Sequence, residues 1–207
     1  MADIKFYNID CIEFMKTKPD NYYDLAIVDP PFGININNNM GRRKGDKKST
    51  YKKVTWDNSI PCEEYFMQLF RVSENQIVWG GNYFLEYLNS TPCFLMWDKQ
   101  FSEHLSFAQF EMAWTSFKTS SKKIEIHPSN IKNRIHPTEK PIKLYRWILH
   151  QYAKQGNKIL DTHGGSMSNA IACYKENFDL DICEIDKEYF DRGVKRYNEF
   201  KQQITMF

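Results

Sequence analysis

Long apolar runs and a leader sequence are both missing from this 207-residue chain. No stretch approaches the roughly 18 consecutive apolar residues that a membrane-spanning helix needs. The first residues, Met-Ala-Asp-Ile-Lys, carry no signal peptide. Internal repeats are absent as well, and the length suits one domain with a hydrophobic core of its own. We therefore expect a soluble, cytoplasmic protein of a single domain.

Paired cysteines and metal-ligand spacings are lacking too. The five cysteines form no C-x-x-C pair, and His127, His136 and His163 stand at no spacing typical of a metal site. Cysteines of this kind are typical of reduced thiols in a protein core. The sequence thus predicts no disulfide framework and indicates no metal. The cysteines are Cys11, Cys62, Cys93, Cys173 and Cys183.

The chain has little net charge overall, but its positive charge is concentrated in one segment. The chain has a net charge of only +2, whereas residues 41–53 hold seven basic residues against the single acid Asp46. Lys and Arg gathered in this way attract phosphate groups and release counterions. A solvated surface run is the alternative reading, but the position beside the D-P-P-F stretch favours nucleic acid. The basic residues are Arg42, Arg43, Lys44, Lys47, Lys48, Lys52 and Lys53.

The stretch Asp24–Phe32 is the first of two that carry chemistry. Its short apolar run Leu25–Val28 ends at two prolines, so it predicts a buried strand. Asp29 then lies at the carboxyl end of that strand, the edge where open α/β sheets place their ligands. The carbonyl of Pro30 has no ladder partner, and Phe32 presents a flat face. An acid, a free carbonyl and an aromatic ring together suit a planar base with an exocyclic amine. The plainer interpretation is a strand followed by a turn, with Phe32 packed as an ordinary aromatic residue.

The second stretch has the pattern strand, small-residue turn, helix, strand, acid. The strand is Lys158–Leu160, the turn is Asp161–Ser166, the helix is Met167–Lys175, and the next strand, Asp179–Cys183, leads into Glu184. Glycines in such a turn let the backbone approach a nucleoside, and the distal carboxylate takes the ribose hydroxyls. An ordinary βαβ unit is the alternative.

The remaining elements follow the same signals. Residues Gly80-Gly81-Asn82 predict a turn or a close approach of the backbone to another group. Segment Thr115–Lys132 is polar and predicts a loop. Thr138 is expected to cap a helix that begins at Pro141 and ends at Gly156. Strands are expected at Ile4–Ile9, Gln76–Trp79, Phe94–Trp97 and Phe110–Trp114, the last two antiparallel; helices are expected at Cys11–Met15, Pro61–Ser73, Pro141–Ala153 and Lys187–Gln202.

With both stretches in view, the sequence resembles the S-adenosylmethionine-dependent DNA amino-methyltransferases. It is most similar to small phage and prophage enzymes of the N6-adenine type, whose D-P-P-F motif precedes the cofactor motif (the β order). The resemblance implies a Rossmann-like α/β fold with a seven-stranded, mostly parallel sheet, one antiparallel strand and helices on both faces. It covers Asp24–Phe32, Asn75–Phe84, Arg134–Tyr145, Lys158–Ala172 and Asp181–Tyr189.

The same resemblance implies residue roles. The catalytic motif matches Asp29, Pro30, Pro31 and Phe32. The acid near the cofactor adenine matches Asp10, the ribose-binding acid matches Glu184, and Thr138 and Lys140 match positions near the methionine end of the cofactor. The full set expected at the S-adenosylmethionine site is Asp10, Cys11, Asp29, His136, Thr138, Lys140, Asp161, His163, Gly164, Gly165, Ser166, Glu184 and Ile185.

Two positions depart from the family pattern. Gly164 stands where the family has a larger residue, and Met167 stands where it has a second glycine. Met167 would bring a side chain to a point where backbone normally passes close to the cofactor. The departure therefore puts the affinity for S-adenosylmethionine in question.

The function that these expectations predict is methylation of adenine N6 in double-stranded DNA after the base leaves the duplex. The alternatives are N4-cytosine methylation, where the family more often carries Ser in place of Asp29, and a non-catalytic DNA-binding protein with a degenerate cofactor site. Methylation of RNA or of a glutamine side chain is a further alternative. Residues 34–60 and 99–133 are expected to contact DNA, in one domain of residues 1–207. The resemblance further suggests a homodimer, a bacterial or phage-infected cell, and, in the absence of a nuclease motif, an orphan modifier.

Overall fold

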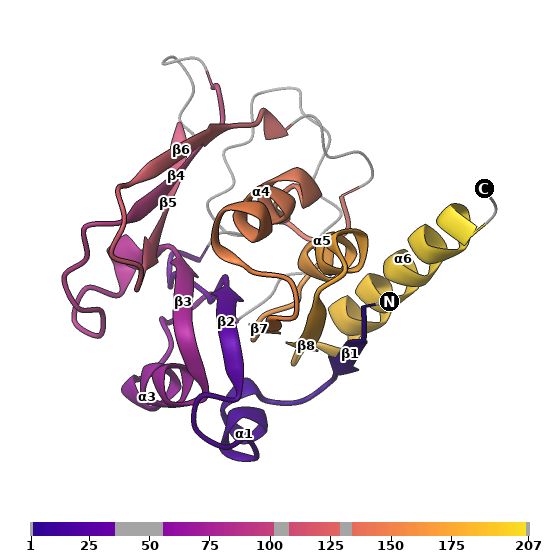
Figure 1. Ribbon diagram of the computed structural model, residues 1–207, viewed down its shortest axis with the longest axis horizontal. Helices are drawn as coiled ribbons and strands as arrows, with labels where there is room; N and C mark the ends of the chain where they lie inside the picture. Colours follow the sequence, from indigo (N-terminus) through magenta and orange to yellow (C-terminus); the bar gives the residue numbers. More distant parts are fainter. Residues whose placement is uncertain (1, 36–55, 102–107, 129–133, 206–207) are drawn as a thin grey trace.

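One eight-stranded sheet forms the frame of the protein (Figure 1). The computed structural model describes residues 2–35, 56–101, 108–128 and 134–205. Along the sheet the strands follow the order β1-β8-β7-β2-β3-β5-β4-β6. Their bounds are β1 (Ile4–Tyr7), β2 (Tyr23–Val28), β3 (Ser73–Trp79), β4 (Phe94–Asp98), β5 (Phe110–Thr115), β6 (Lys122–Glu125), β7 (Lys158–Asp161) and β8 (Asp179–Cys183).

The sheet is mostly parallel, as predicted. Only β5 runs antiparallel to its neighbours β3 and β4, and every other pair is parallel. All seven expected strands are present. The eighth, β6, corrects the prediction of a loop over Thr115–Lys132, since residues Lys122–Glu125 pair with β4. A short charged segment can form a strand at the edge of a sheet, where Lys side chains are common and no hydrophobic alternation is required.

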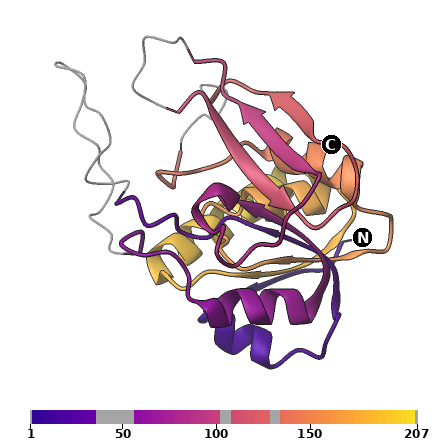
Figure 2. The same cartoon turned by 90° about the vertical axis from the view of Figure 1, so that its left-hand side faces the viewer.

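Helices cover both faces of the sheet. Helices α1 (Cys11–Lys16) and α3 (Glu63–Val72) pack on one face, and α4 (Ile142–Tyr152), α5 (Ser168–Glu176) and α6 (Lys187–Thr205) pack on the other. Figure 2 shows these layers after a quarter turn. Within the described ranges, none of these helices has the length and apolar character needed to cross a membrane.

The central strand β2 explains its apolar sequence. Leu25 and Ile27 belong to the core under α4 and α5, whereas Ala26 and Val28 belong to the core under α1 and α3. A parallel strand buried on both faces has a continuous apolar run rather than an alternating one. Its position in the middle of the sheet places the residue that follows it, Asp29, at the centre of the carboxyl edge.

Three local expectations were wrong. Helix α4 begins at Ile142 after Pro141 as N-cap, and Thr138 does not cap it because its hydroxyl bonds His136 Nδ1. The helix ends at Tyr152 with Ala153 as C-cap, so the Gly156 turn lies beyond it. All five thiols are free, but Cys62 is exposed and Cys11 is only partly buried, so two of them are not core residues.

Candidate active site

Asp29 follows directly on β2, and a buried lysine holds its carboxylate. Asp29 Oδ2 lies 2.6 Å from the Nζ of Lys140, a residue only 3% exposed. The same Nζ lies 3.0 Å from Glu111 Oε2, and Glu111 Oε1 lies 2.5 Å from Lys99 Nζ. Asp29 Oδ1 is buried and has no hydrogen-bond partner in the described part of the chain. Acids and lysines therefore alternate in a charge-balanced row, and one oxygen of Asp29 remains open to a donor.

The row fixes the charges of its members. Burial raises the pKa of Asp29, and the Lys140 ammonium opposes that rise. Burial also works against the charge of Lys140, yet Asp29 and Glu111 hold its pKa above the ordinary value. Although burial alone would raise the pKa of Glu111, Lys140 and Lys99 bring it to about 2. Lys140 therefore stays protonated and Glu111 stays ionised at neutral pH.

Phe32 is seated against the end of β3, where the sequence predicted a close backbone approach. A Cβ atom on Gly80 would lie 2.1 Å from the Phe32 ring, and Gly80 has a φ of +70°. Tyr83 stacks on Phe32 with ring centroids 5.0 Å apart and planes 11° apart, and Phe84 meets the ring edge-on at 6.2 Å. A side chain at position 80 would displace the ring, so Gly80 leaves the space in which Phe32 packs against Tyr83 and Phe84.

The small-residue turn after β7 is built on Asp161. Its two carboxylate oxygens accept the backbone N–H of His163 and the side-chain amide of Asn169, each at 3.0 Å. Burial raises the pKa of Asp161 to about 7, although both hydrogen bonds favour the ionised form. Across the turn, Glu184 accepts the backbone N–H of Gly165 at 2.7 Å and that of Asp186 at 2.8 Å. Glu184 and Asp161 therefore hold the turn from two neighbouring strands.

Met167 lies in this turn with its side chain directed into the core. It has a φ of +57°, the left-handed region that favours glycine, and its side chain is fully buried. A Cβ atom on Gly193 would lie 2.5 Å from Met167 Cγ, and one on Gly164 would lie 2.8 Å from its Sδ. The two glycines thus leave the space that Met167 fills. The two departures from the family pattern, Gly164 and Met167, therefore compensate one another in packing.

Two partly buried histidines flank the turn. Burial lowers the pKa of both His136 and His163 to about 4, so each is neutral at pH 7. Thr162 Oγ1 lies 2.8 Å from His163 Nδ1 and 2.8 Å from the hydroxyl of Tyr65. His136 lies over Gly165, where an added Cβ would be 3.6 Å from its ring.

The other residues expected near the cofactor lie at the same edge. Asp10 is the N-cap of α1, and its Oδ1 accepts the backbone N–H groups of Ile12 (2.9 Å) and Glu13 (3.2 Å). Burial raises the pKa of the Cys11 thiol to about 12. Ile185, directly after Glu184, is exposed. Because β1, β8, β7 and β2 are parallel neighbours, Asp10, Glu184, Asp161 and Asp29 all stand at one edge of the sheet.

Several residues of the site carried no local signal in the sequence. Lys99 and Glu111 come from the β4–β5 region, yet they form a row with Lys140 from another part of the chain. Only spatial pairing identifies such residues, because each lies in an ordinary local pattern. The residues missed in this way are Trp56, Asp57, Lys99, Glu111, Asn169 and Arg196; the last donates to the Ser166 carbonyl at 2.7 Å and pairs with Glu139.

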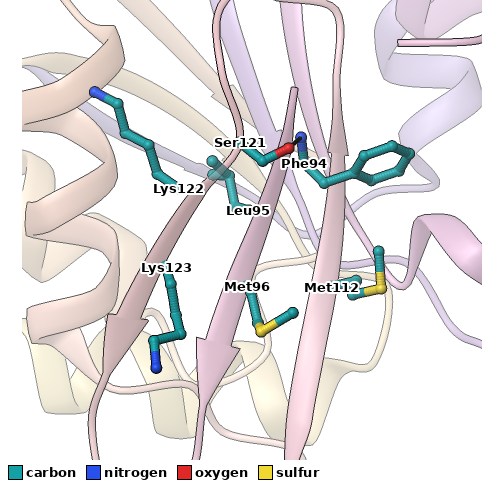
Figure 3. A pocket seen from close by; sticks show the side chains of 7 residues that line it. All are labelled: Phe94, Leu95, Met96, Met112, Ser121, Lys122 and Lys123. Carbon is teal, nitrogen blue, oxygen red and sulfur yellow. Dashed lines mark hydrogen bonds between the residues drawn. The ribbon is translucent and has the colours of Figure 1, made fainter. Parts of the chain in front are cut away.

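Several expected features do not lie at this site in the described part of the chain. The seven basic residues of the 41–53 stretch lie outside the described residues. Across the ranges that the structure covers, no cluster of His, Cys, Asp and Glu could hold a metal ion. A pocket of about 420 Å³ lies over β4, β5 and β6, where Phe94, Met96 and Met112 line it with two lysines (Figure 3). That pocket includes none of the residues expected at the site.

Comparisons with known proteins agree with this architecture. The similar solved structures include the M1.HpyAVI complex with S-adenosylmethionine (19% identity, TM-score 0.60, covering 93% of this chain and 99% of that one). PvuII DNA methyltransferase, which is cytosine-N4-specific, matches at 12% identity and TM-score 0.66 over 99% of this chain and 93% of that one. TTHA0409 from Thermus thermophilus, complexed with S-adenosylmethionine, matches at 12% identity and TM-score 0.60, over 96% of each chain. These likenesses show the fold.

Sequence comparison reaches the family itself. A protein named "Putative methylase YubD" from Escherichia coli (strain K12) is 22% identical over 208 residues, covering 93% of this chain and 89% of that protein. The family model described as DNA methylase, for N6 and N4 methyltransferases, matches residues 71–195, more than half of the chain. The chain therefore belongs to this DNA methylase family, whose methyl donor is S-adenosylmethionine.

Proposed function

We propose that this protein methylates the exocyclic N6 amine of adenine in double-stranded DNA, after the base has left the duplex. Enzymes that act on a base must extrude it from the stack, at a cost of a few kcal/mol. Stacking of the extruded base on an aromatic ring offsets about 1–3 kcal/mol of that cost. Phe32, held in one orientation beyond the end of β2, supports this role.

The observation that carries the proposal is the open oxygen of Asp29. Oδ2 is paired with Lys140, while the buried Oδ1 has no hydrogen-bond partner among the residues described. A buried acceptor without a donor is costly, and functional sites are where such groups are found. An amine N–H of the target base would supply the missing donor.

The chemistry requires orientation more than activation of a leaving group. The lone pair of the amine is delocalised into the purine ring, so the amine is a poor nucleophile. Asp29 Oδ1 and the Pro30 carbonyl accept hydrogen bonds from the two N–H groups of the amine. These bonds draw the nitrogen towards tetrahedral geometry and direct its lone pair at the methyl group. S-adenosylmethionine, when bound, supplies an electrophilic methyl group. The N–C bond would form as the methyl–sulfur bond breaks, with the neutral thioether S-adenosylhomocysteine as the leaving group, and the amine would give one proton to the Asp29 carboxylate, which releases it to solvent.

The donor side is proposed to lie at the turn after β7. We assign Glu184 to the ribose hydroxyls, Asp10, Cys11 and Ile185 to the surroundings of the cofactor adenine, and His136 and Thr138 to its methionine end. A carboxylate offers about four lone-pair positions, so Glu184 can accept ribose hydroxyls while keeping both backbone bonds. The backbone of Asp161, His163, Gly164, Gly165 and Ser166 forms the floor of this site. Lys140 touches Asp29 directly, which supports a role on the acceptor side as well.

Contact with DNA is proposed for the basic stretch. Arg and Lys at this density would bind phosphates as counterions leave the duplex. Residues 34–60 and 99–133, with those of a second subunit in a homodimer, are proposed to read the target sequence.

A single experiment tests the base. The protein is incubated with duplex DNA and S-adenosylmethionine labelled on its methyl group, and the nucleosides released by digestion are analysed by mass spectrometry. The expected product is N6-methyladenine. Label in N4-methylcytosine would instead assign the reaction to cytosine. Absence of label from the DNA would refute the proposed substrate.

A further inference from the structure

Asp57 holds the turn that carries Phe32. Its Oδ1 accepts the backbone N–H groups of Phe32 and Gly33, both at 2.9 Å, and its carbonyl accepts the N–H of Asn35 at 3.0 Å. Only 4% of Asp57 is exposed. Backbone donors after two prolines have no strand partner, and a single carboxylate oxygen satisfies two of them. Asp57 therefore decides the path of the backbone between Pro31 and Asn35.

The residues after Asp57 complete this seat. Gly33 has a φ of +71°, and a Cβ atom there would lie 3.1 Å from the backbone nitrogen of Ile60. The turn at Gly33 and the segment 57–60 thus pack closely, backbone on backbone. Phe32 is in this way fixed from two directions, by its own backbone at Asp57 and by its ring against Gly80.

Trp56 reaches the opposite half of the site. Its ring stacks on His136 with centroids 5.4 Å apart and planes 21° apart. His136 in turn meets Tyr189 edge-on at 4.4 Å and lies over Gly165 in the turn after β7. Trp56 is thus linked through one imidazole to the small-residue turn and to the start of α6.

From these contacts we infer that Trp56 and Asp57 are two consecutive positioning residues. Together they set the distance between the stacking ring of Phe32 and the methyl-donor site at Gly165. This inference rests on the proposed roles of Phe32 and of the turn. Two neighbouring residues cannot move far apart, because consecutive Cα atoms are about 3.8 Å apart across a trans peptide. Methyl transfer is sensitive to such spacing, since a misplacement of about 1 Å can slow a reaction about 100-fold.

The test uses paired variants on the full-length protein. Asp57→Ala removes the shared acceptor, whereas Asp57→Asn keeps an oxygen that can accept both N–H groups. Trp56→Ala removes the stack, whereas Trp56→Phe keeps a flat ring. Glu74→Ala, at an exposed position near the start of β3 and outside the proposed site, is the control. The single-turnover rate of label transfer to DNA is measured without regard to the base, together with the Kd for S-adenosylmethionine by calorimetry and the melting temperature.

We expect Asp57→Ala to slow transfer about 10- to 100-fold while the Kd stays within about threefold, and Asp57→Asn to restore most of the rate. Trp56→Ala is expected to raise the Kd by up to about tenfold and to slow transfer, with Trp56→Phe close to the unmodified protein. A folded Asp57→Ala protein with the full rate overturns the inference, and so does Trp56→Ala with both constants unchanged. Should Asp57→Ala fail to fold, the Trp56 pair alone decides. Methylation of cytosine by the unmodified protein would refute only the proposed base.

Discussion

The ammonium nitrogen of Lys140 lies 2.6 Å from Asp29 Oδ2. Lys140, from the His136–Pro141 segment, therefore balances the charge of Asp29, the first residue of the D-P-P-F motif. Asp29 follows β2, and Lys140 stands two residues before α4, more than 100 positions later in the chain. The pairing opposes the rise that burial causes in the pKa of Asp29 and leaves Oδ1 without a hydrogen-bond partner among the described residues. Glu111 then holds the lysine from its other side.

The acid limb of the pH–rate profile is expected to move with this pairing. Burial raises the pKa of Asp29 and Lys140 opposes the rise, so Lys140→Met should raise that pKa further and shift the acid limb to higher pH. Glu111→Gln removes a like charge, so it should shift the limb to lower pH. Single-turnover rates measured from about pH 5 to 8, where most proteins are most stable, check both signs. Shifts in the same direction for both variants would contradict the electrostatic account.

The free energy of unfolding should also depend on the ion pair between Lys140 and Asp29. Lys140→Met leaves a mostly buried carboxylate without its partner, which typically costs about 3 kcal/mol or more of unfolding free energy. Urea unfolding near pH 8 measures this loss.

Asp29 is expected to be essential for transfer but not for cofactor binding. Asp29→Ala should reduce methyl transfer below detection, and Asp29→Asn should slow it about 100-fold or more because the charge that orients the amine is lost. The Kd for S-adenosylmethionine should stay within about threefold of the original value. Asp24→Asn, at the other end of β2, is the control: its carboxylate accepts the Lys158 N–H at 2.7 Å, far along the strand from Asp29. Turnover by Asp29→Ala would end the assignment.

Met167 and Gly193 are expected to behave as a coupled pair. Gly193→Ala alone should be strongly destabilising, because its Cβ would lie 2.5 Å from Met167 Cγ. In a Met167→Gly background most of that penalty should disappear, giving a double-mutant coupling of about 1–3 kcal/mol. Met167→Gly alone removes a buried side chain, but it also relieves the strain of a non-glycine residue in the left-handed region. We therefore expect a net loss of about 1–3 kcal/mol of unfolding free energy. Calorimetry should show little change in S-adenosylmethionine affinity, and a large gain in affinity would instead place the methionine in the binding site.

The two partly buried histidines, His136 and His163, predict a pH dependence of stability with a defined sign. The pKa of His163 is about 4 in the folded chain, against the ordinary value of 6.5. The unfolded state therefore takes up a proton first, and stability is lost as pH falls from about 6.5 to 4. Asp161 acts in the opposite sense, since its raised pKa of about 7 favours the folded state as pH falls through that value.

Because these two contributions oppose one another, the variant must be compared with the original protein. Between pH 7.5 and 5, His163→Gln should lose about 2 kcal/mol less stability than the original chain. His136→Gln should behave alike, as its pKa is also about 4. Denaturant unfolding at several pH values measures the difference, and parallel curves would show that neither histidine is kept neutral by folding.

The basic stretch is expected to govern the salt dependence of DNA binding. Neutralising Arg42, Arg43, Lys47 and Lys48 should weaken DNA affinity and reduce the slope of log K against log salt by roughly 3 to 4, about 0.9 for each phosphate that is no longer neutralised. A fourfold control with the same change in net charge replaces four exposed lysines elsewhere on the surface by Gln: Lys5, Lys154, Lys175 and Lys195. An unchanged slope in the fourfold variant would show that this stretch does not bind the phosphates.

Much of the fold could be predicted from local patterns. The apolar run of β2, the prolines after Val28 and the small-residue turn after β7 each identify themselves within about ten residues, because periodicity and chain breakers act locally. The edge strand β6 could not be predicted in this way, because it depends on a neighbouring strand. The hydrogen bond of the Thr138 hydroxyl to His136, in place of the expected helix cap, was not predictable either.

The site divides along the same line. The sequence by itself determined the two strand ends that carry Asp29 and Asp161, because each follows a short buried strand and a residue type that breaks it. Only the tertiary structure decided that Lys140 and Glu111 meet at Asp29, that Asp57 holds Phe32, and that Met167 turns inward between Gly164 and Gly193. Most of those contacts join residues far apart in the chain, and their geometry exists only once the sheet has brought its strands side by side.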